Sequence, residues 1–201
     1  LPRGILRYLL FPLGDLTKAQ VRAMAAERSM RTAQKKSSSG LCFVPTTVKA
    51  YLDEATRAKP GRILDASDGY AVVGEHRGVV YYTIGQKKGL GLYKSHLERY
   101  VVDLLAETNE VVVGTREMCR WRALEAGRRN FLTDDEHVPQ RVEAQVRYRQ
   151  KPDPATLTLL AGDAFRLEFD DPQFAVAKGQ SAVIYSGDRL LGGGVITARS
   201  A

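Results

Sequence analysis

The sequence predicts a mainly β protein, with a small α+β part at the N-terminus followed by an antiparallel β-barrel. After residue 60, short runs rich in β-branched and aromatic residues alternate with turns rich in Gly, Asp and Pro, which is typical of small barrels. The first 60 residues carry helix-capping patterns instead. No apolar run is long enough to cross a bilayer, so we expect no membrane partner.

Two helices are expected in the N-terminal part. Thr17 and Gln20 form a capping-box pattern, which predicts a helix over residues 17–29 with an apolar stripe behind it. Thr47, or the threonine before it, can cap a second helix that ends at Pro60-Gly61.

The remaining chain is predicted to form strands, with a turn over Glu75–Gly78. We place a domain boundary near residues 93–99, which divides the chain into a helical and β-ribbon domain, 1–95, and a β-barrel domain, 96–201. The predicted strands are Tyr70–Gly74, Val79–Thr83, Tyr100–Leu104, Val111–Gly114, Val142–Tyr148, Thr156–Leu160, Ala164–Phe169, Ser181–Tyr185 and Leu190–Thr197.

The positive charge of the chain is unevenly placed. The net charge is +7, and residues 1–60 alone hold 11 Lys and Arg against 4 Asp and Glu. A local basic field attracts polyanions such as nucleic acids, although many soluble proteins carry this much charge. Cys42 and Cys119 are far apart and the three histidines show no ligand spacing, so we expect no disulfide framework, no metal site and a reducing cytoplasm.

Cys42 is the candidate nucleophile. It follows Lys35, Lys36 and a run of serines, and nearby positive charge favours a thiolate. The alternative is a small buried hydrophobe beside Leu41 and Phe43, which local composition alone favours. No base stands next to it, so a Cys–His protease has little support.

Two basic segments are candidate RNA contacts. In Gly85–Gly91 the glycines let backbone amides approach an anion, and Gln86, Lys87 and Lys88 are the candidate contacts. This loop matches neither a Walker loop nor a dinucleotide fingerprint, and a solvated hairpin explains it equally well. The second segment, Arg147–Lys151, surrounds an aromatic ring with cations that suit phosphates, or else it is a solvated strand end.

These segments together resemble one family, the tRNA-specific 2-thiouridylases. The matching runs occur in the family's order across nearly the whole chain. They are Phe11–Lys18, Ser38–Phe43, Pro60-Gly61, Gly74–Gly78, Tyr82–Gly91, Tyr100–Asp103, Arg147–Gln150, Gly179–Val183 and Leu191–Gly194.

The resemblance implies a sulfur-transfer activity. Enzymes of this family replace the C2 oxygen of the wobble uridine in certain tRNAs with sulfur, using ATP to adenylate the base and a protein persulfide as sulfur source. The cysteine in the Gly-Leu-Cys-Phe context carries that persulfide, which corresponds to Cys42. The resemblance also implies a barrel like the second domain of elongation factors, and as partners a tRNA anticodon arm and a sulfur-donor protein.

The resemblance assigns tRNA contacts to Arg147, Tyr148, Arg149 and Gln180. The sequence also departs from the family's pattern. We find no Ser-Gly-Gly-Val-Asp-Ser phosphate loop, Cys119 stands in no matching context, and Ser37 replaces a common Asp. The chain opens at Leu1, so we expect a fragment without the ATP-binding domain, inactive alone and with no cofactor of its own.

Two other functions are compatible with the sequence. The first is an RNA-binding module without chemistry, in which Cys42 accepts no sulfur. The second is an interaction domain like that of a translation factor, in which the barrel docks a protein and the charge is incidental. Salt-dependent tRNA binding would distinguish the last from the others.

Overall fold

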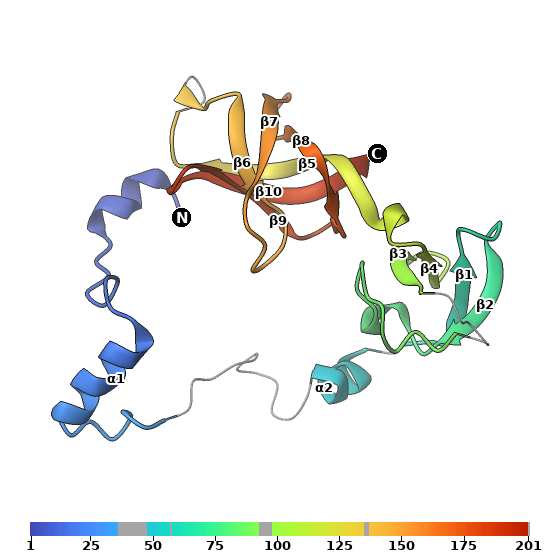
Figure 1. Ribbon diagram of the computed structural model, residues 1–201, viewed down its shortest axis with the longest axis horizontal. Coiled ribbons are helices and arrows are strands. Elements are labelled where there is room, and N and C mark those ends of the chain that lie inside the picture. Colours follow the sequence, from blue (N-terminus) through green and yellow to red (C-terminus); the bar gives the residue numbers. More distant parts are fainter. Residues whose placement is uncertain (36–47, 57, 93–97, 135–136, 201) are drawn as a thin grey trace. The chain divides into compact units, whose positions relative to one another are not determined.

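The computed structural model describes residues 1–35, 48–56, 58–92, 98–134 and 137–200 (Figure 1). The chain divides into two compact units, Leu1–Tyr51 and Leu52–Ala201. The described part is mainly β, with helices at its N-terminal end and a closed antiparallel barrel at its C-terminal end. The predicted fold class is therefore confirmed.

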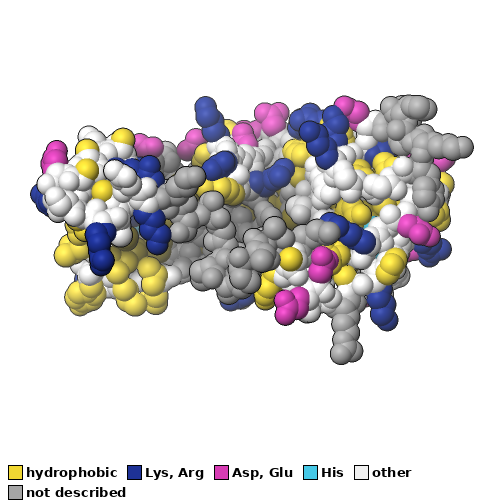
Figure 2. Space-filling view, turned by 90° about the horizontal axis from the view of Figure 1, so that it is seen from below, with side chains coloured by type: hydrophobic (Ala, Val, Ile, Leu, Met, Phe, Trp, Pro, Cys, Tyr) yellow, Lys and Arg dark blue, Asp and Glu magenta, His cyan; other side chains and the backbone are white. Residues whose placement is uncertain are grey.

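The first unit contains the 3-10 helix η1 (Arg3–Tyr8) and the helix α1 (Lys18–Glu27). Thr17 and Gln20 form the expected capping box, since the Gln20 side chain accepts from the Thr17 amide over 2.8 Å and the Thr17 hydroxyl accepts from the Gln20 amide. Neither helix buries a residue, and Phe11 is 77% exposed. Figure 2 shows the resulting patch of hydrophobic side chains at the left edge of the view.

The second unit begins within α2 (Val48–Ala55) and continues into a four-stranded sheet. Its strands β1 (Gly61–Asp65), β2 (Ala71–His76), β3 (Tyr100–Leu105) and β4 (Glu110–Gly114) have the order β2-β1-β4-β3, in which only β1 and β4 are parallel. Its core is formed by Ile63, Ile84, Leu90, Val101, Val111, Val113 and Ala175.

One corner of this sheet depends on Gly61, His76 and Asn109. His76 is buried and both of its ring nitrogens have partners: Nδ1 accepts from the Gly78 amide over 3.0 Å, and Nε2 lies 3.1 Å from the Asn109 carbonyl. Because Nδ1 must accept, Nε2 carries the proton and the ring is neutral. Burial lowers the pKa of His76, although the hydrogen bond to Asn109 partly opposes this.

The barrel contains six strands that pair in the closed antiparallel order β10-β5-β8-β7-β6-β9. Alternate side chains fill its interior, including Leu124, Phe165, Leu167 and Ile184, which are almost completely buried. The strands are β5 (Arg120–Phe131), β6 (Arg141–Gln145), β7 (Asp153–Leu159), β8 (Phe165–Phe174), β9 (Ser181–Ser186) and β10 (Arg189–Ser200).

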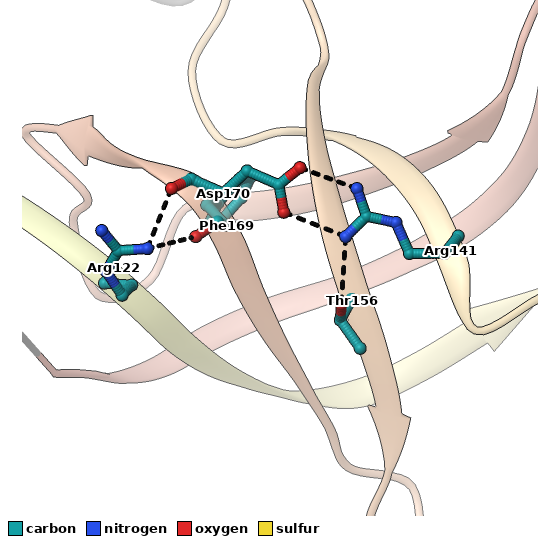
Figure 3. Close-up of polar contacts among 5 residues, drawn as sticks. All are labelled: Arg122, Arg141, Thr156, Phe169 and Asp170. Carbon is teal, nitrogen blue, oxygen red and sulfur yellow. Dashed lines mark hydrogen bonds and ion pairs between the residues drawn. The ribbon is translucent and has the colours of Figure 1, made fainter.

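Two arginines on the outside of the barrel donate hydrogen bonds to β8 from neighbouring strands (Figure 3). Arg141 on β6 reaches across β7, donating to the Thr156 hydroxyl and to both carboxylate oxygens of Asp170 over 2.9 and 2.7 Å. From the other side, Arg122 on β5 donates to the backbone carbonyl of Asp170 over 2.9 Å. Hydrogen bonding by Arg141 lowers the pKa of Asp170, so the ion pair between these two side chains stays charged at neutral pH.

One predicted strand was wrong, and two strands were not predicted. Val79–Thr83 is not a strand, because Gly78 turns the chain with a φ of 143° and Val79–Tyr81 forms a 3-10 helix. Strands β1 and β5 were missed. The sequence of β5 is rich in Ala, Leu, Glu and Arg, which favour helices, and only pairing with β8 and β10 makes it a strand.

The sheet pairing also bears on the division of the chain. Strands β3 and β4 pair with each other, and β4 pairs with β1, so residues 100–114 share a sheet with residues 61–76. We therefore propose to place the boundary between the sheet and the barrel after Gly114 and before Arg120. Over the described residues, every helix is too short or too polar to span a bilayer.

Candidate nucleic-acid interface

Antiparallel pairing places two of the predicted contact segments at the same end of the barrel. Gln145, the last residue of β6, pairs with Val183 near the start of β9. The loop after β6 contains Arg147, Tyr148 and Arg149, and Gln180 immediately precedes β9. These two segments are 30 residues or more apart in the sequence, and the register brings them to one edge.

The β6–β7 loop presents Tyr148 to solvent. The carbonyl of Arg147 accepts from the Gln150 amide over 3.2 Å and from the Gln145 side chain over 2.8 Å, which closes a tight turn. Arg149 has a φ of 65°, and its guanidinium lies 5.2 Å from the centroid of the Tyr148 ring. Tyr148 is 88% exposed, which suits a ring that stacks on an unpaired base.

A hollow of about 450 Å³ lies beside this turn and is bounded by residues of β8 and the β6–β7 loop. Its base is fixed by amide groups, because Gln150 donates to Asp153 over 2.9 Å and also to Gln173. Gln173 is buried and in turn donates to the Asp171 carbonyl over 2.8 Å. The rim carries Arg120, whose Nη1 donates to the Pro172 carbonyl over 3.0 Å.

The Gly85–Gly91 loop is attached to β3 rather than free in solvent. The Gly85 amide donates to the Val101 carbonyl, and the Val101 amide donates to the Gln86 carbonyl. The Gln86 side chain accepts from the Thr83 amide and donates to the Lys88 carbonyl, so it holds the loop itself. Lys87 forms an ion pair with Glu98, and Lys88 and Gln180 are exposed.

Phe174 links the two basic segments. The Arg147 guanidinium lies 5.8 Å from the centroid of the Phe174 ring, and Tyr100 meets the same ring edge-on at 5.9 Å. The Lys87 ammonium lies 6.0 Å from the centroid of the Tyr100 ring. An unbroken series of contacts therefore runs from the Gly85–Gly91 loop to the β6–β7 turn.

Sequence reasoning missed Phe174 and Arg116. The Arg116 guanidinium lies 5.2 Å from the Phe174 ring centroid, although 58 positions separate the two residues in the chain. No local sequence motif marks either residue. Their proximity depends on how the four-stranded sheet packs against the end of the barrel, which the residues next to them in the sequence do not indicate. The strand predicted there ended at Phe169, so the position of Phe174 at the end of β8 was not visible in the sequence either.

The two cysteines differ in what the structure shows. Cys42 lies in residues 36–47, outside the described residues. Cys119 has no exposed surface, and its Sγ lies 3.5 Å from the Val101 carbonyl. Burial raises the pKa of the Cys119 thiol, with nearby Arg199 and Arg116 opposing the rise, so this thiol is protonated and inaccessible.

Metal and nucleotide binding find little support within the described ranges. No three metal-ligating side chains gather there. The Gly85–Gly91 loop lacks the Gly-Lys-Ser/Thr ending with which a Walker loop holds a nucleoside triphosphate, and its Gln86 side chain is engaged within the loop. The described surface instead offers an exposed aromatic ring bordered by arginines, which defines a class of site suited to single-stranded nucleic acid.

Comparison with known families identifies three consecutive domains of tRNA-modifying proteins. Residues 1–46 match the tRNA methyl transferase HUP domain, and residues 49–115 match the tRNA methyl transferase PRC-barrel domain. Residues 121–196 match the aminomethyltransferase beta-barrel domain. The last two ranges agree with the four-stranded sheet and the closed barrel, respectively.

Several similar curated proteins are named tRNA-specific 2-thiouridylase MnmA. That of Deinococcus radiodurans is 50% identical over 97% of this chain and 51% of its own length. Those of Thermus thermophilus and Carboxydothermus hydrogenoformans are 49% and 44% identical, over 52% and 55% of their lengths. The chain belongs to the tRNA-specific 2-thiouridylase family, and it spans about half the length of these relatives.

Proposed function

We propose that this chain supplies the sulfur-carrying cysteine and part of the tRNA-binding surface for 2-thiolation of the wobble uridine, in the cytoplasm. The observation that carries the RNA part is the series of contacts from Lys87 through Tyr100 and Phe174 to Arg147. It joins two segments chosen independently from the sequence. Identity of about half over nearly the whole chain to named 2-thiouridylases supports the sulfur part.

The RNA surface is proposed to combine charge with stacking. Arg147 and Arg149 contact phosphates of the anticodon arm, while Tyr148 stacks on an unpaired base. Gln180, Gln86, Lys87 and Lys88 border this surface as further contacts. Gln86 acts mainly by shaping the loop, because its side chain is committed to Thr83 and Lys88.

The sulfur transfer is proposed to pass through Cys42. The Cys42 thiolate attacks the outer sulfur of a persulfide on a sulfur-donor protein; the donor S–S bond breaks, the donor leaves as a thiolate, and Cys42 holds the new persulfide. The outer sulfur of this persulfide then bonds to C2 of the uridine, while the bond from C2 to its activated oxygen breaks. A second thiolate attacks Sγ of Cys42, which releases the thiocarbonyl and leaves a disulfide for an external reductant. Buried Cys119 is unsuited to that second role.

ATP would supply the activation of the uridine oxygen, as the family resemblance implies. The Gly85–Gly91 loop is not a Walker loop, so none of its residues is proposed to hold ATP. Residues 1–46, which match the HUP domain, are the part of the chain that we propose to act with this chemistry. Residues 3–27 bury no side chain within their helices, which suits a segment that packs within a larger domain.

The role of Cys42 is tested with Cys42→Ser in the full-length protein. We expect thiolation of tRNA to fall to background while the dissociation constant for tRNA stays within about twofold of wild type. Cys119→Ser is the matched control and should retain thiolation. Retained thiolation by Cys42→Ser would remove the sulfur-carrying role and favour a binding module without chemistry.

The RNA surface is tested with Tyr148→Ala, measured as tRNA affinity. Loss of one stacking platform should weaken binding by about tenfold. Tyr70→Ala is the matched control, since Tyr70 is also exposed but lies at the turn between β1 and β2. Equal affinities of the two variants would argue that the β6–β7 loop does not contact tRNA.

A further inference from the structure

Arg116 lies on the connection between the four-stranded sheet and the barrel, one residue before the 3-10 helix η3 (Glu117–Cys119). Its side chain is exposed, and its guanidinium lies 5.2 Å from the centroid of the Phe174 ring. Arg147 approaches the same ring at 5.8 Å from the barrel side. Two guanidinium groups from distant segments of the chain thus contact the same Phe174 ring.

Phe174 is itself firmly held. It is the last residue of β8, where it packs against the core of the four-stranded sheet. A Cβ added to Gly85 would lie 3.0 Å from the Phe174 ring and 2.5 Å from Ala175, so the backbone of the Gly85–Gly91 loop presses against it. Tyr100 contacts the ring edge-on. A ring fixed on these sides limits where the two guanidinium groups can lie.

Stacking on an aromatic ring leaves the edge of a guanidinium free to donate hydrogen bonds. Two such groups over one fixed ring present several N–H donors in one place, a geometry that suits the oxygens of a nucleic-acid backbone. The positive charge of Arg116 lowers the pKa of two carboxyl groups, those of Glu98 and Glu117. Glu98 also forms an ion pair with Lys87, so Arg116 shares this carboxylate with a second cation.

We propose that Arg116 is a further contact for the RNA backbone, and that Phe174 positions Arg116 and Arg147 as a pair. This inference rests on the proposed tRNA-binding function of the chain. It extends the interface from the barrel loop onto the connection between the sheet and the barrel. Bound RNA then contacts both the barrel and its connection to the four-stranded sheet.

The test measures tRNA affinity of the full chain as a function of salt for three variants. Arg147→Gln probes the proposed RNA surface, Arg116→Gln probes the new contact, and Arg189→Gln is the control. Arg189 is an exposed arginine at the turn between β9 and β10, the opposite end of β9 from Gln180. All three variants change the net charge by one unit.

We expect Arg116→Gln to weaken binding by about tenfold and to reduce the slope of log K against log salt concentration by about 0.7 to 1. Arg116→Lys should restore most of the slope, because it keeps the charge. The urea unfolding midpoint of Arg116→Gln should match that of wild type, since the side chain is exposed.

The outcomes separate the two proposals. If Arg147→Gln weakens binding and Arg116→Gln behaves like Arg189→Gln, the contact by Arg116 is refuted while the RNA surface stands. If neither Arg147→Gln nor Tyr148→Ala weakens binding, the RNA surface itself is refuted. Loss of binding by Arg116→Gln together with an earlier unfolding midpoint would assign Arg116 a structural role and overturn the proposal.

Discussion

Arg199, near the end of β10, reaches out of the barrel to Asp103 on β3, donating from Nη2 to the carboxylate over 2.9 Å. The same Nη2 donates to the Val102 carbonyl, and Nη1 donates to the Val176 carbonyl over 2.7 Å. The arginine side chain is only 5% exposed and stacks over Trp121. One guanidinium therefore connects the barrel to the four-stranded sheet.

Replacing Arg199 with Met should destabilise the second unit by about 3 kcal/mol, because two backbone carbonyls lose a charged donor at a buried site. Urea unfolding followed by tryptophan fluorescence measures this, since Trp121 is the single tryptophan. Arg141→Met, which breaks an exposed ion pair, is the control and should cost far less. Comparable losses of unfolding free energy in the two variants would show that Arg199 does not hold the barrel and the four-stranded sheet together.

Acid should destabilise the corner held by His76. The pKa of His76 is lowered in the folded state from an ordinary value of 6.5, so protonation favours the unfolded chain. The contribution is present above pH 6.5 and is lost as the pH falls below it. Unfolding free energies measured between about pH 8 and pH 5 should therefore decline. In His76→Gln this part of the decline should vanish, whereas His137→Gln should keep it.

Gly61 should tolerate no side chain. A Cβ there would lie 2.1 Å from the Asn109 carbonyl oxygen and 2.7 Å from His76 Nε2. Gly61→Ala must displace backbone, and we expect a loss of about 2 to 3 kcal/mol in unfolding free energy. The matched control is Gly127→Ala in β5, where the nearest atom to an added Cβ is 3.7 Å away. Near-equal unfolding midpoints for Gly61→Ala and Gly127→Ala would show that the backbone around Gly61 can shift to accept a side chain.

Glu98 should restrain RNA binding. Its hydrogen bond with Lys87 lowers the pKa of Glu98 and raises the pKa of Lys87, so both groups are charged at neutral pH. Glu98→Gln removes an anion close to Lys87 and Arg116, and tRNA affinity should rise several-fold with a steeper salt dependence. Glu168→Gln, an exposed carboxylate on β8, is the control. An unchanged affinity for Glu98→Gln would place Lys87 outside the interface.

Much of the fold could be predicted where the deciding interactions are local. The capping box of Thr17 and Gln20 predicts the start of α1, because both partners lie within one turn. Strands such as β3, β4, β9 and β10 were predicted because β-branched residues and turn glycines mark them. Glycine is also required in β10, since a Cβ at Gly193 would lie 2.3 Å from the Ala182 carbonyl oxygen.

The strand β5 shows where local patterns are insufficient. Its residues favour a helix, yet it pairs on both edges and contributes Leu124 and Ala126 to the barrel interior. The run at Val79–Thr83 shows the reverse, since its first three residues form the 3-10 helix Val79–Tyr81 after Gly78. In both segments the tertiary contacts outweigh a propensity of less than about 1 kcal/mol per residue.

The sequence by itself determined the chemistry available to this protein: a cysteine behind basic and serine residues, a glycine-rich basic loop, and an aromatic ring flanked by arginines. Their residue types and order also revealed the family. Only the tertiary structure decided which of these groups meet. Lys87, Arg116 and Arg147 converge because β-sheet register and the packing of Phe174 against Tyr100 set their positions, and such long-range pairing leaves no mark in neighbouring residues.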